Sequence, residues 1–235
     1  MQNIYHQSCV FYFKNKKMLS QTEENYLKEV YKLMEAEQSS VSTNAIAQRM
    51  NTAAASVTDM VKRLSEKKLL NYERYKGVKL SDEGNQMAKQ LIRKHRLWEV
   101  FLLKSLHFAW DEVHDIAEQL EHIKSEELIN RLDAFLEFPR FDPHGDPIPD
   151  QNGNYEIRKQ LLINELKTNQ LATVVGVNEH ATSFLQYLDK IGIQIGTVIK
   201  VIETYDFDQS RLIEFENKKQ VMLSGKVSES IFVKI

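Results

Sequence analysis

The sequence predicts a mainly α-helical protein with a small β barrel at its C-terminal end. Apolar residues recur at helical spacing up to about residue 135, and all four prolines then fall between residues 139 and 149. From residue 172 onward, short segments rich in strand-forming residues alternate with turns. A chain of 235 residues has room for two or three such modules.

The N-terminal part begins with three predicted helices. Helical periodicity starts near Tyr26, and Ser42 or Thr43 can cap a short second helix. A third helix places Val57 on its apolar face, and only the turn at residues 51–53 separates it from the second. Two helices joined by a tight turn are typical of a helix-turn-helix.

A hairpin and a long helix complete this first module. Residues 69–75 are rich in strand formers, Lys76 and Gly77 can turn the chain, and residues 78–80 return. Ser81 then caps a long helix that we expect to end near Leu106. Three helices, a hairpin and a helix are the element order of a winged helix-turn-helix.

Two acidic helices and an irregular connector follow. The first spans about residues 111–123, and Ser125 caps the second. Residues 139–153 contain the prolines and two glycines, which predicts an irregular connector where the compact helical part ends. Residues 160–166 fit either a strand or a short helix.

The C-terminal part is expected to be a small barrel of short strands with one helix. The predicted strands are 172–177, 198–202, 212–215, 221–223 and 231–233, and the helix lies around residues 184–188.

Composition places the chain among ordinary soluble proteins of a reducing compartment. Hydrophobic residues make up 42% and charged residues 27% of the chain, so a sizeable core is available. Its single cysteine, Cys9, excludes an internal disulfide, which favours a cytoplasmic location. Residues 1–17 lack the apolar core of an export signal and are expected to be an extension preceding a start at Met18. No segment approaches the apolar length of a membrane span, so no membrane partner is expected.

Charge is distributed unevenly and favours a polyanionic partner for the N-terminal part. Residues 41–104 contain 13 Lys and Arg against 6 Asp and Glu, whereas residues 105–153 contain 3 against 12. The third helix carries short polar groups suited to base edges and phosphates, and the hairpin adds basic residues. The candidate DNA-binding residues are Thr52, Ala55, Ser56, Thr58, Asp59, Lys62, Arg63, Arg74 and Lys76. A three-helix module for protein contacts is the alternative.

A second constellation of residues can bind a divalent cation. His95 and Glu99 are four residues apart, and His114, Glu118 and His122 repeat this spacing, so each set shares one helix face. Imidazole and carboxylate suit Mn, Fe, Co, Ni or Zn, and the absence of thiolate disfavours soft metals. The alternative is that the histidines and acidic residues are ordinary surface groups.

These segments together resemble the diphtheria-toxin-repressor family of iron- and manganese-dependent regulators, from Met18 to the C-terminus. The resemblance implies a winged helix-turn-helix DNA-binding domain, a helical metal-binding and dimerisation domain, and a C-terminal SH3-like domain. It rests on residues 22–28 (TEENYLK), 56–58 (SVT), 93–99 (RKHRLWE), 113–115 (VHD), 118–122 (EQLEH) and 143–149 (PHGDPIP). The expected boundaries are 18–84, 85–138, a connector over 139–165, and 166–235.

The resemblance also implies two metal sites in each subunit, for Mn²⁺ or Fe²⁺. The ancillary site would use His95, Glu99 and His114. A ligand from the SH3-like domain usually completes this site in the family, and Glu179 and His180 are the residues at the expected place.

The primary site would use Glu118, Glu121 and His122, together with a residue of the first helix. Iron-sensing members carry Cys in place of Glu118 and Met in place of Asn25, whereas manganese-sensing members carry Glu and Asp. Glu118 therefore favours Mn²⁺. Asn25 departs from both patterns, so Glu24 is kept as an alternative ligand.

The function expected from these features is metal-dependent repression of transcription by a homodimer bound to a palindromic operator, which controls metal-homeostasis genes. A winged-helix regulator of a small organic ligand is the main alternative. A metallohydrolase is a weaker one, since no Ser/His/Asp, P-loop or dinucleotide motif accompanies the cluster. We therefore expect a repressor and not an enzyme.

Overall fold

The structure is a computed structural model that describes residues 19–37, 39–73 and 76–235. The chain divides into two compact units, one up to Leu91 and one from Ile92 onward, and each unit is described by itself. The extension at residues 1–17, the start at Met18 and the predicted DNA contact Arg74 lie outside the described residues.

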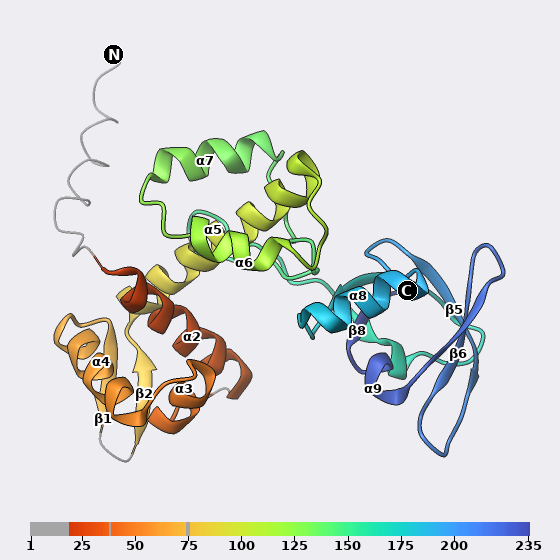
Figure 1. Ribbon diagram of the computed structural model, residues 1–235, viewed down its shortest axis with the longest axis horizontal. Helices are drawn as coiled ribbons and strands as arrows, with labels where there is room; N and C mark the ends of the chain where they lie inside the picture. Colours follow the sequence, from red (N-terminus) through yellow and green to blue (C-terminus); the bar gives the residue numbers. More distant parts are fainter. Residues whose placement is uncertain (1–18, 38, 74–75) are drawn as a thin grey trace. The chain divides into compact units, whose positions relative to one another are not determined.

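The N-terminal unit has the expected winged helix-turn-helix order (Figure 1). Asn51 has a φ of 48° in the turn between the second and third helices, a conformation that asparagine tolerates better than most residues. Ser42 accepts a hydrogen bond from the Ala45 N–H and so caps the second helix, as predicted. The elements are α2 (Gln21–Glu37), α3 (Thr43–Arg49), α4 (Ala54–Glu66), β1 (Leu70–Glu73), β2 (Gly77–Leu80) and the start of α5 (Asp82–Leu106).

One apolar core holds these elements together. The side chains of Leu27 on α2, Ile46 on α3 and Val57 and Val61 on α4 are almost completely buried. Strand β1 pairs antiparallel with β2 in the register Leu70 to Leu80, which forms the wing. This packing leaves the opposite face of α4 exposed.

The helical part of the second unit is built on α5, which ends at Leu106 as expected. Two shorter helices follow, α6 (Val113–Leu120) and α7 (Glu126–Phe135). Ser125 caps α7 by accepting a hydrogen bond from the Leu128 N–H. Helix α6 is shorter than the predicted span 111–123, because the chain turns immediately before Val113 and again after Leu120.

The connector after α7 is irregular, as predicted, but it packs as part of the core. Asp142 accepts hydrogen bonds from the backbone N–H groups of His144 and Asp146, so its side chain replaces regular secondary structure. Ile148 joins the apolar cluster of α5, α6 and α7. The connector thus contributes to the apolar core of the helical part, whereas the sequence suggested that the compact part ends before it.

The C-terminal part is a six-stranded antiparallel sheet with two short α-helices. The strands are ordered β3-β8-β4-β5-β6-β7, and register shifts bend β4 and β5 in the manner of small barrels. Its elements are β3 (Leu161–Leu162), the 3-10 turn Ile163–Glu165, β4 (Leu171–Val177), α8 (Thr182–Ile191), β5 (Val198–Thr204), β6 (Arg211–Phe215), β7 (Gln220–Leu223), α9 (Gly225–Ser228) and β8 (Ile231–Lys234).

The connector lies directly against strand β4. Gly145 has a φ of +88°, and a Cβ atom there would come within 2.2 Å of the Val175 carbonyl oxygen, so only glycine fits. Arg158 donates hydrogen bonds to the carbonyl oxygens of Gly145 and Val175. These contacts fix the residues around Gly145 beside the sheet. None of the described helices is both long and apolar enough to span a bilayer.

Candidate metal centre

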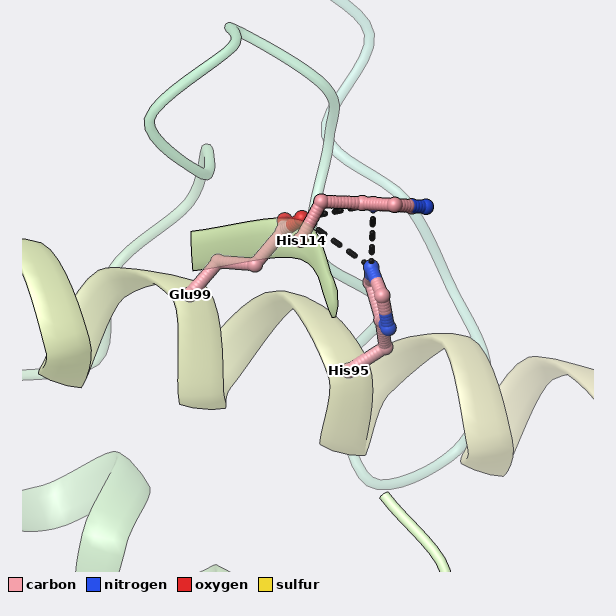
Figure 2. A group of neighbouring side chains, drawn as sticks. All are labelled: His95, Glu99 and His114. Carbon is pink, nitrogen blue, oxygen red and sulfur yellow. Dashed lines mark hydrogen bonds and ion pairs between the residues drawn. The ribbon is translucent and has the colours of Figure 1, made fainter. Parts of the chain in front are cut away.

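Three electron-pair donors from two helices converge in the second unit. His95 and Glu99 are one turn apart on α5, and α6 brings His114 against them (Figure 2). The Nε2 atom of His95 lies 3.0 Å from Glu99 Oε1 and 3.1 Å from His114 Nδ1, and the third side of the triangle measures 3.2 Å. The predicted spacing on α5 and α6 therefore produces one compact group, the helical triad.

The helical triad has the dimensions of one face of an octahedral coordination sphere. Adjacent ligands of an octahedral ion with bonds of about 2.1 Å are about 3.0 Å apart. His95, Glu99 and His114 could each contribute one ligand atom to such an ion. Their donor set therefore fits a divalent transition metal.

The remote nitrogen of His95 is held by a carboxylate. Its Nδ1 atom lies 2.6 Å from Oε2 of Glu121, a side chain with no exposed surface. A neutral imidazole that donates from Nδ1 presents the lone pair of Nε2 to the triad. Carboxylate–histidine pairs of this kind orient the ring and increase its basicity in metal sites.

A second group of donors comes from the connector and shares Glu99. The side chains of Glu99, Asp142 and His144 are buried and offer three ligand atoms within 4.8 Å of one another. The Nε2 atom of His144 lies 2.9 Å from the Trp110 carbonyl oxygen, so it donates there and leaves the Nδ1 lone pair free. His144 Nδ1 lies 3.8 Å from Glu99 Oε1. We call this set the connector group.

Helical spacing does not reveal Asp142 and His144 as candidate ligands, although the segment 143–149 contributes to the family resemblance. The reason is that the connector has no regular period. The available signal was a carboxylate and an imidazole two residues apart among the prolines.

A buried arginine binds the acidic side of the connector group. Arg96 follows His95 on α5, and its guanidinium lies 3.5 Å from Asp142 Oδ2 and 3.1 Å from Asp146 Oδ2. It also donates a hydrogen bond of 2.5 Å to the Pro147 carbonyl oxygen. Arg96 therefore attaches the connector to α5 at three points.

The pKa values of Glu99 and Asp142 shift in opposite directions. Burial alone would raise the pKa of Glu99, but the charge of His95 and hydrogen bonds from His114 and His95 outweigh it and hold the pKa well below its usual range. Burial and the charges of Glu99 and Asp146 raise the pKa of Asp142 well above its usual range, against the opposing effect of Arg96. The connector group therefore has a deficit of positive charge.

The loop between β4 and α8 contributes His180 at the edge of the connector group. Its ring centroid lies 4.9 Å from that of His144, and its Nε2 atom lies 4.0 Å from Asp146 Oδ2. Burial lowers the pKa of His180 more than the nearby charge of Asp146 raises it. Glu179, the other candidate from this loop, is exposed, and its Oε1 accepts the Ala181 N–H.

The residues expected in the primary site lie close to the helical triad. Glu118 is 46% exposed at its side chain, and its Oε1 lies 3.8 Å from His114 Nε2. His122 Nε2 lies 3.9 Å from Glu121 Oε1. The structure thus groups Glu121 with His95 and His122.

The predicted ligands of the first helix belong to the N-terminal unit. Asn25 and Glu24 lie on α2, and both side chains are partly buried. The side-chain oxygen of Asn25 is buried and has no hydrogen-bond partner among the described residues.

The predicted DNA contacts lie on or near the exposed face of α4. Thr52, Ala55, Ser56, Asp59, Lys62 and Arg63 are exposed. Thr58 is partly buried, and its hydroxyl donates to the Ala54 carbonyl oxygen. In the wing, Lys76 is exposed and pairs with Glu73 at 2.7 Å. These side chains leave a polar, basic surface around the helix.

Three family models together cover most of the chain. Residues 18–78 match the N-terminal DNA-binding domain of iron-dependent repressors, and residues 81–150 match the metal-binding and dimerisation domain of the same proteins. Residues 161–235 match the FeoA domain. The SH3-like class expected for the C-terminal part agrees with this match.

Comparisons with individual proteins agree with these family matches. The diphtheria toxin repressor of Corynebacterium glutamicum is 29% identical over 228 residues, which cover 92% of this chain and 97% of the relative. A solved manganese-dependent transcriptional repressor in complex with manganese is 33% identical with a TM-score of 0.78, and the match covers 90% of this chain and 98% of that one. The structure of ScaR with bound Cd²⁺ is 32% identical with a TM-score of 0.71, over the same shares of 90% and 98%. The chain belongs to the diphtheria-toxin-repressor family of iron- and manganese-dependent transcriptional repressors.

Proposed function

We propose that this repressor binds a two-fold symmetric operator as a homodimer when Mn²⁺ or Fe²⁺ occupies the His/Glu centre, and that it controls metal-homeostasis genes in the cytoplasm. One observation supports the metal dependence above all others. The helical triad brings three donor atoms within 3.2 Å of one another, and lone pairs at such distances need a proton or a cation between them. A metal ion satisfies all three at once.

The donor set favours Mn²⁺ over softer metals. The two groups around Glu99 offer imidazole nitrogens and carboxylate oxygens, and hard oxygen donors suit Mn²⁺. The proposed ancillary ligands are His95, Glu99 and His114. The assignment of Glu118, Glu121 and His122 to the primary site, with Asn25 or Glu24, is retained as a proposal, as are the domain boundaries 18–84, 85–138, 139–165 and 166–235.

Exposed apolar residues on the helical part support the homodimer. Leu106 is 53%, Phe135 66% and Phe138 59% exposed. Large apolar groups gathered on one domain are typical of protein contacts. We propose that a second copy of the chain covers these exposed residues, because residues 81–150 match a dimerisation domain.

The α4 surface is proposed to read the operator, with Thr52, Ala55, Ser56, Thr58 and Asp59 near the bases and Lys62, Arg63, Arg74 and Lys76 on phosphates. A dimer related by a two-fold axis places two such helices in successive major grooves. The selected DNA should therefore contain two inverted half-sites.

Operator affinity measured against metal concentration tests this function. DNA is first selected from a randomised pool by wild-type protein in the presence of Mn²⁺, and its binding is then followed by fluorescence anisotropy with Mn²⁺, Fe²⁺ or Zn²⁺. We expect Mn²⁺ and Fe²⁺ to increase the affinity of wild-type protein and His95→Ala to remove this increase. His107→Asn is the control, because His107 is exposed and asparagine tolerates its φ of 59°. Undiminished metal dependence in His95→Ala would contradict the proposal.

A further inference from the structure

We infer that Asp59 on α4 selects cytosine at one position of each operator half-site. This inference rests on the proposed function, because it requires α4 to lie in a major groove. It goes further by naming both the side chain that discriminates between bases and the base that it accepts.

The buried face of α4 determines where Asp59 points. Val57 and Val61 are completely buried in the core of the N-terminal unit, and Asp59 lies two residues from each of them in the chain. Because a helix turns by about 100° per residue, two residues correspond to about 200° in either direction. Asp59 therefore points directly away from the core. Its side chain is 76% exposed, as expected for the outermost position of the helix.

The N-terminal turn of α4 leaves room for the Asp59 carboxylate to reach a base. Ala55 lies one turn before Asp59 on the same face and presents only a methyl group, and Ala54 is equally small. In a recognition helix, residues near the N-terminus contact the base edges. Asp59 is therefore the first side chain along the outward face of α4 that can accept a hydrogen bond from a base.

The carboxylate of Asp59 is free to make such a hydrogen bond. Its one partner among the described residues is Lys62, whose Nζ atom lies 3.9 Å from Asp59 Oδ1, beyond hydrogen-bond distance. Asp59 thus loses no hydrogen bond within the protein when it turns toward a base. The nearby ammonium also offsets part of the repulsion between the carboxylate and the DNA phosphates.

The negative charge of Asp59 determines which base it can accept. An ionised carboxylate offers only acceptor atoms. In the major groove guanine and thymine present acceptors, and adenine presents the acceptor N7 beside its N6 donor, whereas cytosine presents the N4 donor without an acceptor. The carboxylate therefore binds cytosine and is repelled by an acceptor atom of each other base.

Systematic base substitution in the operator tests the inference. Starting from DNA that wild-type protein selects in the presence of Mn²⁺, each half-site position is changed symmetrically to all four bases. Affinity is measured by fluorescence anisotropy at one fixed salt concentration. We expect one position at which cytosine binds about 10-fold or more tightly than any other base.

Three variants identify the residue responsible for this preference. Asp59→Ala should lose the preference at this position alone. Asp59→Asn should prefer adenine there, because an amide matches adenine N6 and N7. Glu66→Gln is the matched control, since it removes a negative charge from an exposed residue two turns further along α4, and it should retain the preference for cytosine. Circular dichroism of each variant checks its helix content.

Base preferences that are the same in Asp59→Ala and wild type at every position would overturn the inference. So would a position that depends on Asp59 but favours a base other than cytosine.

The same measurements separate this inference from the proposed function. If Asp59→Ala keeps the wild-type preferences while Mn²⁺ still increases operator affinity, the role of Asp59 is wrong and the metal-dependent repressor stands. If Asp59→Ala loses the cytosine preference but operator affinity does not respond to Mn²⁺, the role of Asp59 stands and the proposed switch is wrong. Failure of wild-type protein to select any sequence would overturn both.

Discussion

The two donor groups around Glu99 are built by different means. In the helical triad, fixed helical spacing on α5 and the packing of α6 set three donor distances between 3.0 and 3.2 Å. In the connector group, an irregular segment supplies Asp142 and His144, and the contact between His144 Nδ1 and Glu99 Oε1 is 3.8 Å. Helices thus give close and rigid placement, while the connector depends on separate contacts that attach it to α5.

Those separate contacts explain how an irregular segment can hold ligands in place. Arg96 attaches it to α5, Trp110 accepts from His144, and the Asp142 side chain replaces its backbone hydrogen bonds. Asp142 and His144 are therefore each held by a neighbour outside the connector group. We expect the helical triad to bind its ion more tightly than the connector group, because less reorganisation is needed.

The largest effect should follow from removing the residue that both groups share. Glu99→Ala leaves both the helical triad and the connector group without the carboxylate that they share, so affinity for Mn²⁺ at this centre should fall by more than about 100-fold. Isothermal titration calorimetry measures this change. Equal affinity in Glu99→Ala and wild type would show that neither group binds the ion.

A smaller effect is expected from the carboxylate behind the helical triad. Glu121→Gln removes the negative charge that holds His95 Nδ1 at 2.6 Å, and affinity for Mn²⁺ should fall by about 10–100-fold. Glu137→Gln, an exposed residue of the same helical part, is the matched control and should not change affinity. If Glu121→Gln abolished binding at the helical triad as completely as Glu99→Ala, Glu121 would be a ligand of the ion in the helical triad itself, in addition to its proposed place in the primary site.

The sequence was sufficient to predict the helices and the wing, because each depends on local rules, whereas the grouping of His95, Glu99 and His114 was implied by the family resemblance. Spacing of four residues puts His95 and Glu99 on one face of α5, and Ser42, Ser81 and Ser125 mark helix starts. The one feature that spacing could not provide was which face of α6 would meet α5. That depends on packing, which brought His114 to His95 and Glu99.

The connector group was not predictable in the same way. Asp142 and His144 approach Glu99 only because Arg96, Gly145 and the sheet hold the segment in place, and these are contacts between residues far apart in the chain. Glu121 illustrates the same limit. The family resemblance indicated it as a ligand, whereas its position opposite His95 Nδ1 is a property of the folded protein.

The next prediction concerns stability without metal and its dependence on pH. The pKa of Asp142 is raised by burial and by Glu99 and Asp146, so its contribution to stability is present at low pH and is lost as pH rises through the raised pKa. Asp142→Asn should therefore increase the free energy of unfolding of the metal-free protein at neutral pH by about 1 kcal/mol. Urea unfolding at pH 4 and pH 7 measures this, and the gain over wild type should be larger at pH 7. A gain that is larger at pH 4 would mean that the folded protein stabilises the ionised form of Asp142 instead.

The smallest effect should come from substitutions of His180. They test whether this residue supports the connector group or binds the metal directly. Its ring lies beside that of His144, but its Nε2 atom is 4.0 Å from Asp146 and it belongs to neither compact donor group. His180→Ala should therefore weaken Mn²⁺ binding only a few-fold, through looser packing of His144 and without loss of an ion. His180→Phe keeps a ring against His144 without a donor nitrogen, so it should recover most of the affinity if packing is the whole contribution. Isothermal titration calorimetry on both variants measures the affinity for Mn²⁺ and the number of ions bound. If His180→Phe binds one ion fewer than wild type, His180 is a ligand from the loop between β4 and α8, and the connector group has a fourth member.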